Sequence, residues 1–124
     1  MLTVSVRDVM VDDVATAAPD ATLHDAADRM ASRDVGSLVV VEDGAVVGIL
    51  THSDVLRHLA TDGDPATARI AECMGSPPIT IDPDADAEDA AMRLATEDVK
   101  RLPVVEDGEL VGIVTVTDLS YFLP

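Results

Sequence analysis

Residues 104–118 read VVEDGELVGIVTVTD, and residues 40–54 read VVEDGAVVGILTHSD. The repetition extends along the chain, because a shift of 64 positions aligns residues 6–60 with residues 70–124 without a gap. About 24 of these 55 aligned pairs are identical. Similarity at a fixed spacing predicts one supersecondary unit that occurs twice. We therefore expect repeats at residues 1–61 and 69–124, joined by a linker at residues 62–68 that begins with turn-forming residues.

The order of elements expected in each repeat is strand, helix, strand, strand, helix, which is an α+β fold. Apolar residues at helical spacing predict helices near residues 23–32 and 87–96. Asp43-Gly44 joins two apolar runs, 38–42 and 46–51, and Asp-Gly at such a place predicts a type I′ hairpin. The first run is wholly apolar up to Glu42, so we expect both faces of that strand to be buried.

Gly48 interrupts the second strand of this hairpin, and a glycine there predicts close approach of another backbone or of a ligand. A repeat of about 55 residues buries little core by itself. The two repeats are therefore expected to pack together through their sheets about a pseudo-twofold axis.

The composition is strongly acidic, with 24 Asp and Glu against eight Lys and Arg and a net charge of −16. Nucleic-acid binding depends on basic residues that neutralise phosphates, so this class of partner is disfavoured, and anionic membranes are disfavoured likewise. Aspartate outnumbers glutamate and Lys100 is the only lysine. This pattern resembles proteins of salt-accumulating halophiles, in which concentrated salt screens the self-repulsion of the folded state.

Cys73 is the single cysteine, so no internal disulfide can form and a reducing compartment is expected. No apolar run approaches the roughly 20 residues of a membrane span. Residues 1–10 contain Arg7 and Asp8 and lack the apolar core of a signal peptide. These features together predict a cytoplasmic protein.

The chain resembles a tandem pair of cystathionine-β-synthase (CBS) domains, also called a Bateman module. The resemblance rests on GILTHSD at 48–54, GIVTVTD at 112–118, LPVV at 102–105 and the Met-x(8)-Pro that opens each repeat, and it covers almost the whole chain. It implies adenine-nucleotide binding in clefts between the repeats, and face-to-face homodimers formed through paired helices. AMP, ADP or ATP is the expected ligand, with S-adenosylmethionine as a further possibility.

The doubled motif Thr-x-x-Asp has two interpretations from its chemistry alone. Thr51 with Asp54, and Thr115 with Asp118, can form capping boxes at the start of a helix. The same aspartates can accept hydrogen bonds from the two hydroxyls of a ribose, which is the role that the family resemblance implies. The two roles are compatible with each other.

Other candidate ligand contacts differ between the repeats. Lys100-Arg101 precedes the last hairpin and is a candidate phosphate clamp, whereas the first repeat has Gly36-Ser37 at this position. The sequence leaves open which aspartate accompanies Arg101. The resemblance implies adenine contacts at two short extended pieces, and His52 lies inside the first motif. These further candidates are Thr16, Ala17, Thr80, Ile81 and His52.

No catalytic motif and no metal-ligand spacing is recognised in the sequence, so we expect neither an enzyme nor a metal or required cofactor. His24 and His58 are expected at the surface, Cys73 as a small buried hydrophobic residue, and the internal methionines in the core. The leading hypothesis is a regulatory module that senses adenine nucleotides and acts through its own dimer or an unknown protein partner. The alternatives are a ligand-free dimerisation scaffold, in which the motifs serve only as helix caps, and, less favoured, an enzyme that acts on nucleotides.

Overall fold

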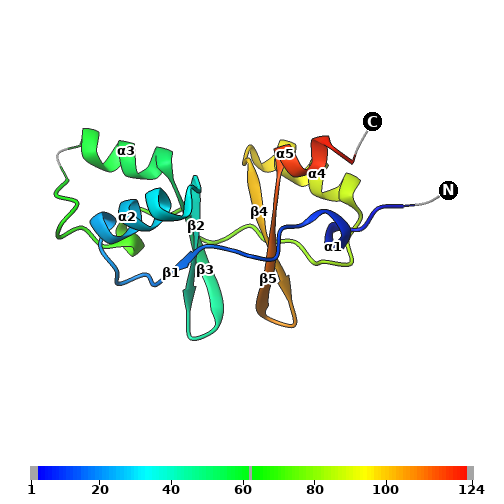
Figure 1. The fold of residues 1–124 in the computed structure, drawn as a ribbon, viewed down its shortest axis with the longest axis horizontal. Helices are drawn as coiled ribbons and strands as arrows, with labels where there is room; N and C mark the ends of the chain where they lie inside the picture. The colour runs from blue at the N-terminus through cyan, green and yellow to red at the C-terminus, as the bar shows by residue number, and fades with distance from the viewer. Residues whose placement is uncertain (1–2, 62, 123–124) are drawn as a thin grey trace. The chain divides into compact units, whose positions relative to one another are not determined.

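The computed structural model describes residues 3–61 and 63–122 (Figure 1). Its helices and strands form two compact units, and each unit holds one of the two predicted hairpins. One unit comprises Ala15–Pro78, and the other combines Met1–Val14 with Ile79–Pro124. The mixture of helices with sheets confirms the α+β fold class predicted from the sequence.

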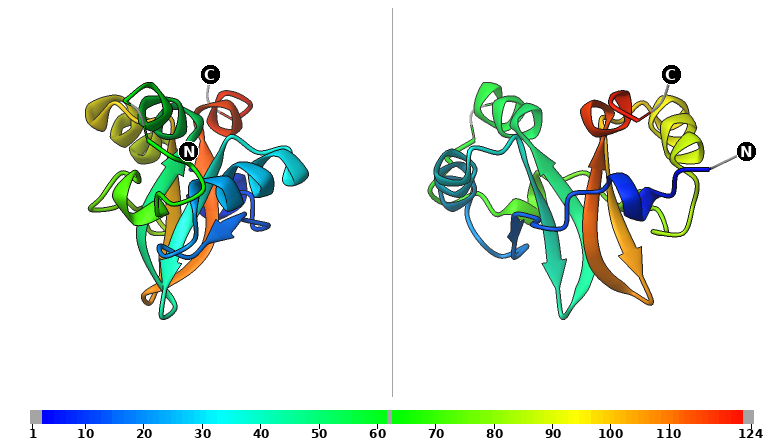
Figure 2. Two further views of the ribbon diagram at one scale, coloured as in Figure 1. Left: turned by 90° about the vertical axis from the view of Figure 1, so that its left-hand side faces the viewer. Right: turned by 45° about the vertical axis from the view of Figure 1, so that its right-hand side comes forward.

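The unit Ala15–Pro78 contains a three-stranded sheet in the order β1-β2-β3. β1 is parallel to β2, and β2 is antiparallel to β3. Its strands are β1 (Thr16–Ala17), β2 (Ser37–Glu42) and β3 (Ala45–Thr51), and its helices are α2 (Leu23–Arg33), α3 (His52–Ala60) and the short 3₁₀ helix η1 (Ile70–Glu72). Figures 1 and 2 show α3 continuing directly from the end of β3 that is remote from the hairpin turn.

The other unit repeats this arrangement around a two-stranded antiparallel sheet. Its elements are α1 (Val6–Val9), α4 (Ala87–Glu97), β4 (Arg101–Glu106), β5 (Glu109–Thr115) and α5 (Val116–Ser120). In place of β1, it has a single parallel bridge between Ile81 and Val104. The predicted order of strand, helix, strand, strand and helix is therefore confirmed, with one strand reduced to a bridge.

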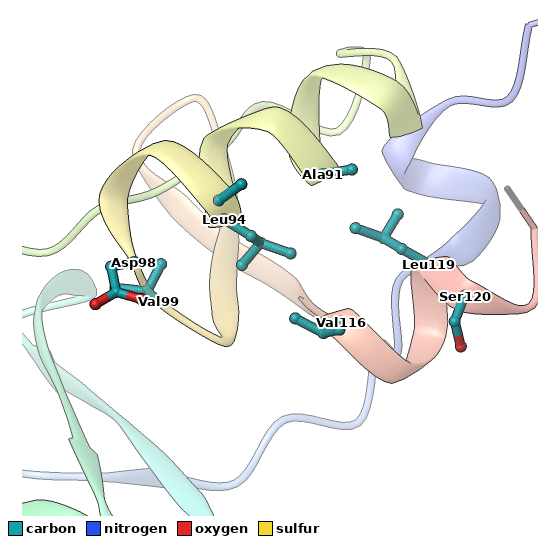
Figure 3. A pocket seen from close by; sticks show the side chains of 8 residues that line it. Ala91, Leu94, Asp98, Val99, Val116, Leu119 and Ser120 are labelled. Atoms are coloured by element: carbon teal, nitrogen blue, oxygen red, sulfur yellow. The ribbon is translucent and has the colours of Figure 1, made fainter.

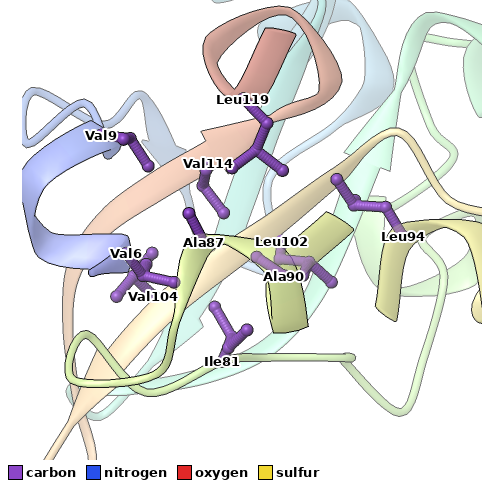
Figure 4. Packing of buried hydrophobic residues seen from close by; sticks show 10 residues of the cluster. All are labelled: Val6, Val9, Ile81, Ala87, Ala90, Leu94, Leu102, Val104, Val114 and Leu119. Carbon is purple, nitrogen blue, oxygen red and sulfur yellow. The ribbon is translucent and has the colours of Figure 1, made fainter. Parts of the chain in front are cut away.

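Each repeat begins with a lead-in segment, which contains α1 in the first repeat and η1 in the second. The two lead-in segments are exchanged between the units. Val6 and Val9 of α1 pack in the same core as Leu102 and Val104, which belong to the second repeat (Figure 4). Backbone hydrogen bonds hold this segment in place, since Val6 N–H donates to Ala85 O at 2.8 Å. The boundaries of the sequence repeats therefore differ from the boundaries of the packed units.

The corresponding segment of the second repeat packs with the first repeat. Ala68 and Ile70 lie in the core that contains Leu23 and Leu50, and Ile70 N–H donates to Ala21 O at 2.9 Å. The lead-in segments align with each other in sequence and both carry apolar residues. Each can therefore fill the other's place, and the sequence alone did not reveal the exchange.

Both hairpins have the predicted turn. Asp43 and Gly44 have φ values of 52° and 82°, and Asp107 and Gly108 have the same pair of values. Positive φ at both central residues defines the type I′ turn, whose twist matches that of the flanking strands. A register shift between Val40 and Val41 marks a β-bulge, and it recurs between the corresponding residues of β4.

Close backbone approach explains why both repeats have a glycine in the second strand of the hairpin. A Cβ atom on Gly48 would lie 2.6 Å from Met74 Sδ and 2.8 Å from Gly75 O. At Gly112 a Cβ atom would lie 2.6 Å from Met10 Sδ and 3.0 Å from Val11 O. The sequence left a backbone and a ligand as alternatives, and the structure places a backbone segment with its methionine against each glycine.

Burial of the first hairpin strand and of Met30 follows the sequence pattern, whereas that of Met92 does not. Leu38, Val39 and Val40 are each 0% exposed, which confirms the buried strand, and Met30 is also in the core. Met92 is 67% exposed, so its prediction as a core residue was wrong: it lies on the solvent side of α4. Within the described residues, no helix has the length and apolar character required to cross a membrane.

Candidate functional site

Thr51 and Asp54 form a complete capping box where β3 passes into α3. Thr51 N–H donates to Asp54 Oδ2 at 2.8 Å, and Thr51 Oγ1 donates to the same oxygen at 3.1 Å. In return, Asp54 N–H donates to Thr51 Oγ1 at 3.4 Å. These bonds satisfy backbone N–H groups that the first turn of a helix leaves unpaired. The cap interpretation of this motif is therefore confirmed.

Thr115 and Asp118 form the same box between β5 and α5. Thr115 N–H donates to Asp118 Oδ2 at 3.0 Å, and Asp118 N–H donates to Thr115 Oγ1 at 3.1 Å. Both boxes are half-buried. The cap thus uses Oδ2 of each aspartate, and the hydrogen bonding of Oδ1 distinguishes the two motifs.

Asp54 Oδ1 accepts a hydrogen bond from Arg57 Nη1 at 3.1 Å. The Asp54 side chain is 14% exposed, whereas that of Arg57 is 69% exposed. At the position that corresponds to Arg57, the second repeat has Tyr121, which is well exposed. Among the described residues, Asp118 Oδ1 has no hydrogen-bond partner. Asp118 therefore presents a free acceptor oxygen, and Asp54 does not.

Arg101 lies beside the second capping box. It is paired directly with Thr115 in the β4–β5 ladder, and the neighbouring Val116 N–H donates to Lys100 O at 3.0 Å. Arg101 and Asp118 therefore belong to the same unit, and their sharing of one ligand site is a prediction. In the other unit Ser37 is paired with Thr51, so no cation occupies the corresponding place.

The two cations of this pair differ in environment. Lys100 is exposed, whereas Arg101 is half-buried, and this burial lowers the pKa of the Arg101 guanidinium. An arginine stays protonated in proteins even so. A charged group that has lost part of its hydration gains from an anionic partner, and a guanidinium can bind phosphate oxygens in a bidentate manner.

The candidate adenine contacts fall into two groups. Thr16 and Ala17 are half-buried in β1, an edge strand, and they line a pocket of about 170 Å³. Ile81 is 8% exposed within the core, and its backbone N–H donates to Pro103 O at 3.0 Å. Thr80, the residue before the bridge at Ile81, is half-buried.

The histidines do not follow a single pattern. His52 is exposed at the first position of α3, and His24 is also exposed, as expected. His58 was wrongly expected at the surface, because its ring is half-buried and its Nδ1 lies 3.3 Å from Cys73 Sγ. Burial, with smaller contributions from Glu72 and Asp54, raises the pKa of the Cys73 thiol. Among the described residues, no three His, Cys, Asp or Glu side chains are grouped as metal ligands.

An apolar groove lies between α4 and α5 in the same unit as Asp118 (Figure 3). Its volume is about 550 Å³, and side chains from the two helices face each other across it. The groove residues are Ala91, Leu94, Ala95, Asp98, Val99, Val116, Leu119 and Ser120. Val116 is about half exposed, so part of this apolar surface is open to solvent.

Comparison with known families follows the two repeats closely. The CBS domain family matches residues 6–61 and again residues 70–124. The chain belongs to the CBS domain family. This CBS pair is 35% identical over 116 residues to the CBS domain-containing protein YhcV of Bacillus subtilis (strain 168), covering 94% of this chain and 83% of that protein.

Solved CBS structures share the fold of the whole pair. The CBS domain pair of protein MJ0100, solved in complex with 5′-methylthioadenosine and S-adenosyl-L-methionine, has a TM-score of 0.89 at 28% identity, covering 98% of this chain and 96% of that chain. A hexameric CBS-CP12 protein from bloom-forming cyanobacteria has a TM-score of 0.88 at 28% identity, covering 97% of this chain and 72% of that chain. The predicted family and fold are confirmed.

Proposed function

We propose that this CBS pair is a non-enzymatic regulatory module that binds an adenine nucleotide at Thr115, Asp118 and Arg101. The observation that carries the proposal is the free Oδ1 atom of Asp118 in the unit whose capping Thr115 is paired with the half-buried Arg101. The similar CBS pair of MJ0100 was solved with two adenosine-type ligands, which supports an adenosine moiety as the recognised group.

The ribose is the part of the ligand that Asp118 recognises. An ionised carboxylate oxygen has two acceptor sites, so Oδ2 can keep its bond from Thr115 N–H and still accept another. Oδ1 accepts the second ribose hydroxyl. Hydrogen bonds to a charged group contribute about 1.5–3 kcal/mol each. The cap holds the carboxylate in position before the ligand arrives, which reduces the ordering required on binding.

Arg101 supplies the contact to phosphate. Its charge favours AMP, ADP or ATP over adenosine, and over S-adenosylmethionine, whose sulfonium is cationic. Ser37 stands at the corresponding place in the other unit, so the two sites have different charge preferences. The site at Thr51 and Asp54, with Thr16, Ala17 and His52 on its unit, is the weaker nucleotide site.

Isothermal titration calorimetry in molar KCl tests the proposal. AMP, ADP, ATP and S-adenosylmethionine are titrated separately into the full chain, and the nucleotides are expected to bind more tightly than S-adenosylmethionine. No heat with any of the four ligands would favour the ligand-free scaffold, in which the capping boxes have no further role. Release of phosphate from ATP in the same buffer would instead revive the enzyme hypothesis.

In this proposal, ligand binding acts by changing the self-association of the protein. The apolar groove between α4 and α5 is a surface that a second copy of the chain can cover, giving a homodimer. The similar cyanobacterial CBS-CP12 protein was described as hexameric, which supports self-association in this family. Because α5 begins at the nucleotide site and ends in the groove, ligand binding and assembly share one helix.

A further inference from the structure

Arg57 occupies the ligand-facing oxygen of one site only. Its Nη1 donates to Asp54 Oδ1 at 3.1 Å, while Oδ2 of the same carboxylate is held by Thr51. Both oxygens of Asp54 are therefore engaged within the protein. In the other unit the same box leaves Asp118 Oδ1 without a partner among the described residues, because Tyr121 replaces Arg57.

The geometry of the pair favours a contact that a ligand can displace. Arg57 follows Asp54 by three residues on α3, a spacing at which side chains meet on the helix surface. The Arg57 side chain is 69% exposed, and it is free to turn toward water. Asp54 Oδ2 already accepts two bonds from Thr51, and Arg57 takes one of the two acceptor sites of Oδ1, so Asp54 can accept both ribose hydroxyls only when Arg57 is displaced.

We propose that Arg57 is a specificity-determining residue that weakens ribose binding at Asp54 by occupying Oδ1. This inference rests on the proposed function, because it assumes that both capping boxes can bind a ribose. It makes the two sites unequal for a second reason that is independent of Arg101. Arg57 lowers the affinity of the site at Asp54 for every ligand with a ribose, whether or not a phosphate is present.

The expected size of the effect follows from the exposure of Arg57, whose side chain is 69% exposed. Exposed ion pairs are weak, so displacing Arg57 lowers the ligand affinity by about two- to fivefold. Because salt screens such a pair, the effect shrinks as the KCl concentration rises. The site at Asp54 therefore gains affinity for a ribose ligand in concentrated salt.

The experiment isolates the site at Asp54 and uses adenosine as the probe, because adenosine has the ribose hydroxyls and no phosphate. Asp118→Asn, which removes the charge of the other carboxylate, provides the background. In that background Arg57→Tyr introduces the residue that the second repeat has at this position. Arg93→Tyr makes the same charge change on α4 and serves as the matched control. Among the described residues, Arg93 has no ion-pair partner.

Calorimetry is run at the lowest KCl concentration at which circular dichroism shows all variants folded, and again in 3 M KCl. Arg57→Tyr is expected to raise the adenosine affinity about two- to fivefold at the lower concentration, with a smaller rise in 3 M KCl, while Arg93→Tyr leaves it unchanged. An unchanged or reduced affinity, or no detectable binding up to millimolar adenosine, overturns the role of Arg57. Failure of the proposed function is a separate result, because wild-type protein would then bind no nucleotide at Asp118.

Discussion

Arg101 is paired with Thr115 across the β4–β5 ladder, and Thr115 Oγ1 accepts a hydrogen bond from Asp118 N–H at 3.1 Å. A fixed cation, a hydroxyl and a carboxylate therefore belong to one unit and to adjoining elements. The other unit has the hydroxyl and the carboxylate but Ser37 in place of the cation. Duplication has thus preserved the capping box in both repeats while the residues around it have diverged.

Replacing Arg101 by serine, the residue of the first repeat, tests the phosphate contact. Arg101→Ser should lower ATP affinity by about tenfold or more, because a charge-assisted hydrogen bond is lost, and should leave adenosine affinity nearly unchanged. Calorimetry with both ligands gives the comparison, and Lys100→Ser is the control at the exposed neighbour. An equal loss for ATP and adenosine would show that Arg101 supports the fold of the site and does not bind phosphate.

A charge placed in the α4–α5 groove tests the dimer. Val116→Glu puts a carboxylate among the apolar groove residues and should convert a dimer to a monomer. Thr117→Glu changes the same charge at the next position of α5, which does not line the groove, and should leave the dimer intact. Size-exclusion chromatography with light scattering gives the molar mass. The groove would lose its proposed role if both variants kept the wild-type mass.

Much of the fold could be predicted because its local signals were strong. Asp43-Gly44 and Asp107-Gly108 require positive φ, and this requirement fixed the turns and the strands on either side. The exchange of the lead-in segments could not be predicted, because Val6 and Ile70 are equally suitable for either core. The core in which such a segment packs depends on the tertiary path of the chain, and a local sequence pattern does not indicate it.

The site was predicted in part, since the capping role of both Thr-x-x-Asp motifs followed from their spacing. The partners of the carboxylates depend on side-chain direction, so the pairing of Asp54 with Arg57 was not foreseen. The contact of His58 with Cys73 joins residues 15 positions apart through the end of α3, and no motif signals it. Nucleotide specificity and a cytoplasmic location remain predictions.

The acidic composition predicts a salt-dependent fold. At a net charge of −16 the folded chain repels itself in dilute buffer, whereas at 1 M salt the Debye length is about 3 Å and the repulsion is screened. Circular dichroism should show loss of the helices in dilute buffer and their return in molar KCl. A spectrum that stays the same between these conditions would contradict the halophilic interpretation.

The raised pKa of Cys73 predicts a pH dependence of stability. Desolvation disfavours the thiolate in the folded state, so the folded protein keeps a proton that the unfolded chain releases above its thiol pKa of about 8.5. The free energy of unfolding should therefore fall as the pH rises above that value. Urea denaturation from pH 7 to 10 measures it, and Cys73→Ala should show a shallower fall. If the free energy of unfolding fell equally with pH in the wild type and in Cys73→Ala, this effect of burial would be contradicted.

The most direct test of the account is calorimetric titration of ATP into the wild type, Asp118→Asn and Asp54→Asn in molar KCl. Asparagine keeps an oxygen that can accept the Thr115 or Thr51 N–H, so the capping bond is retained while the charge is removed. Asp118→Asn is expected to lower the affinity of the tighter site by about ten- to 150-fold, in line with one charged hydrogen bond, and Asp54→Asn is expected to leave that site unchanged. Unchanged ATP binding in Asp118→Asn, with the protein folded, would contradict the central claim that this carboxylate holds the nucleotide.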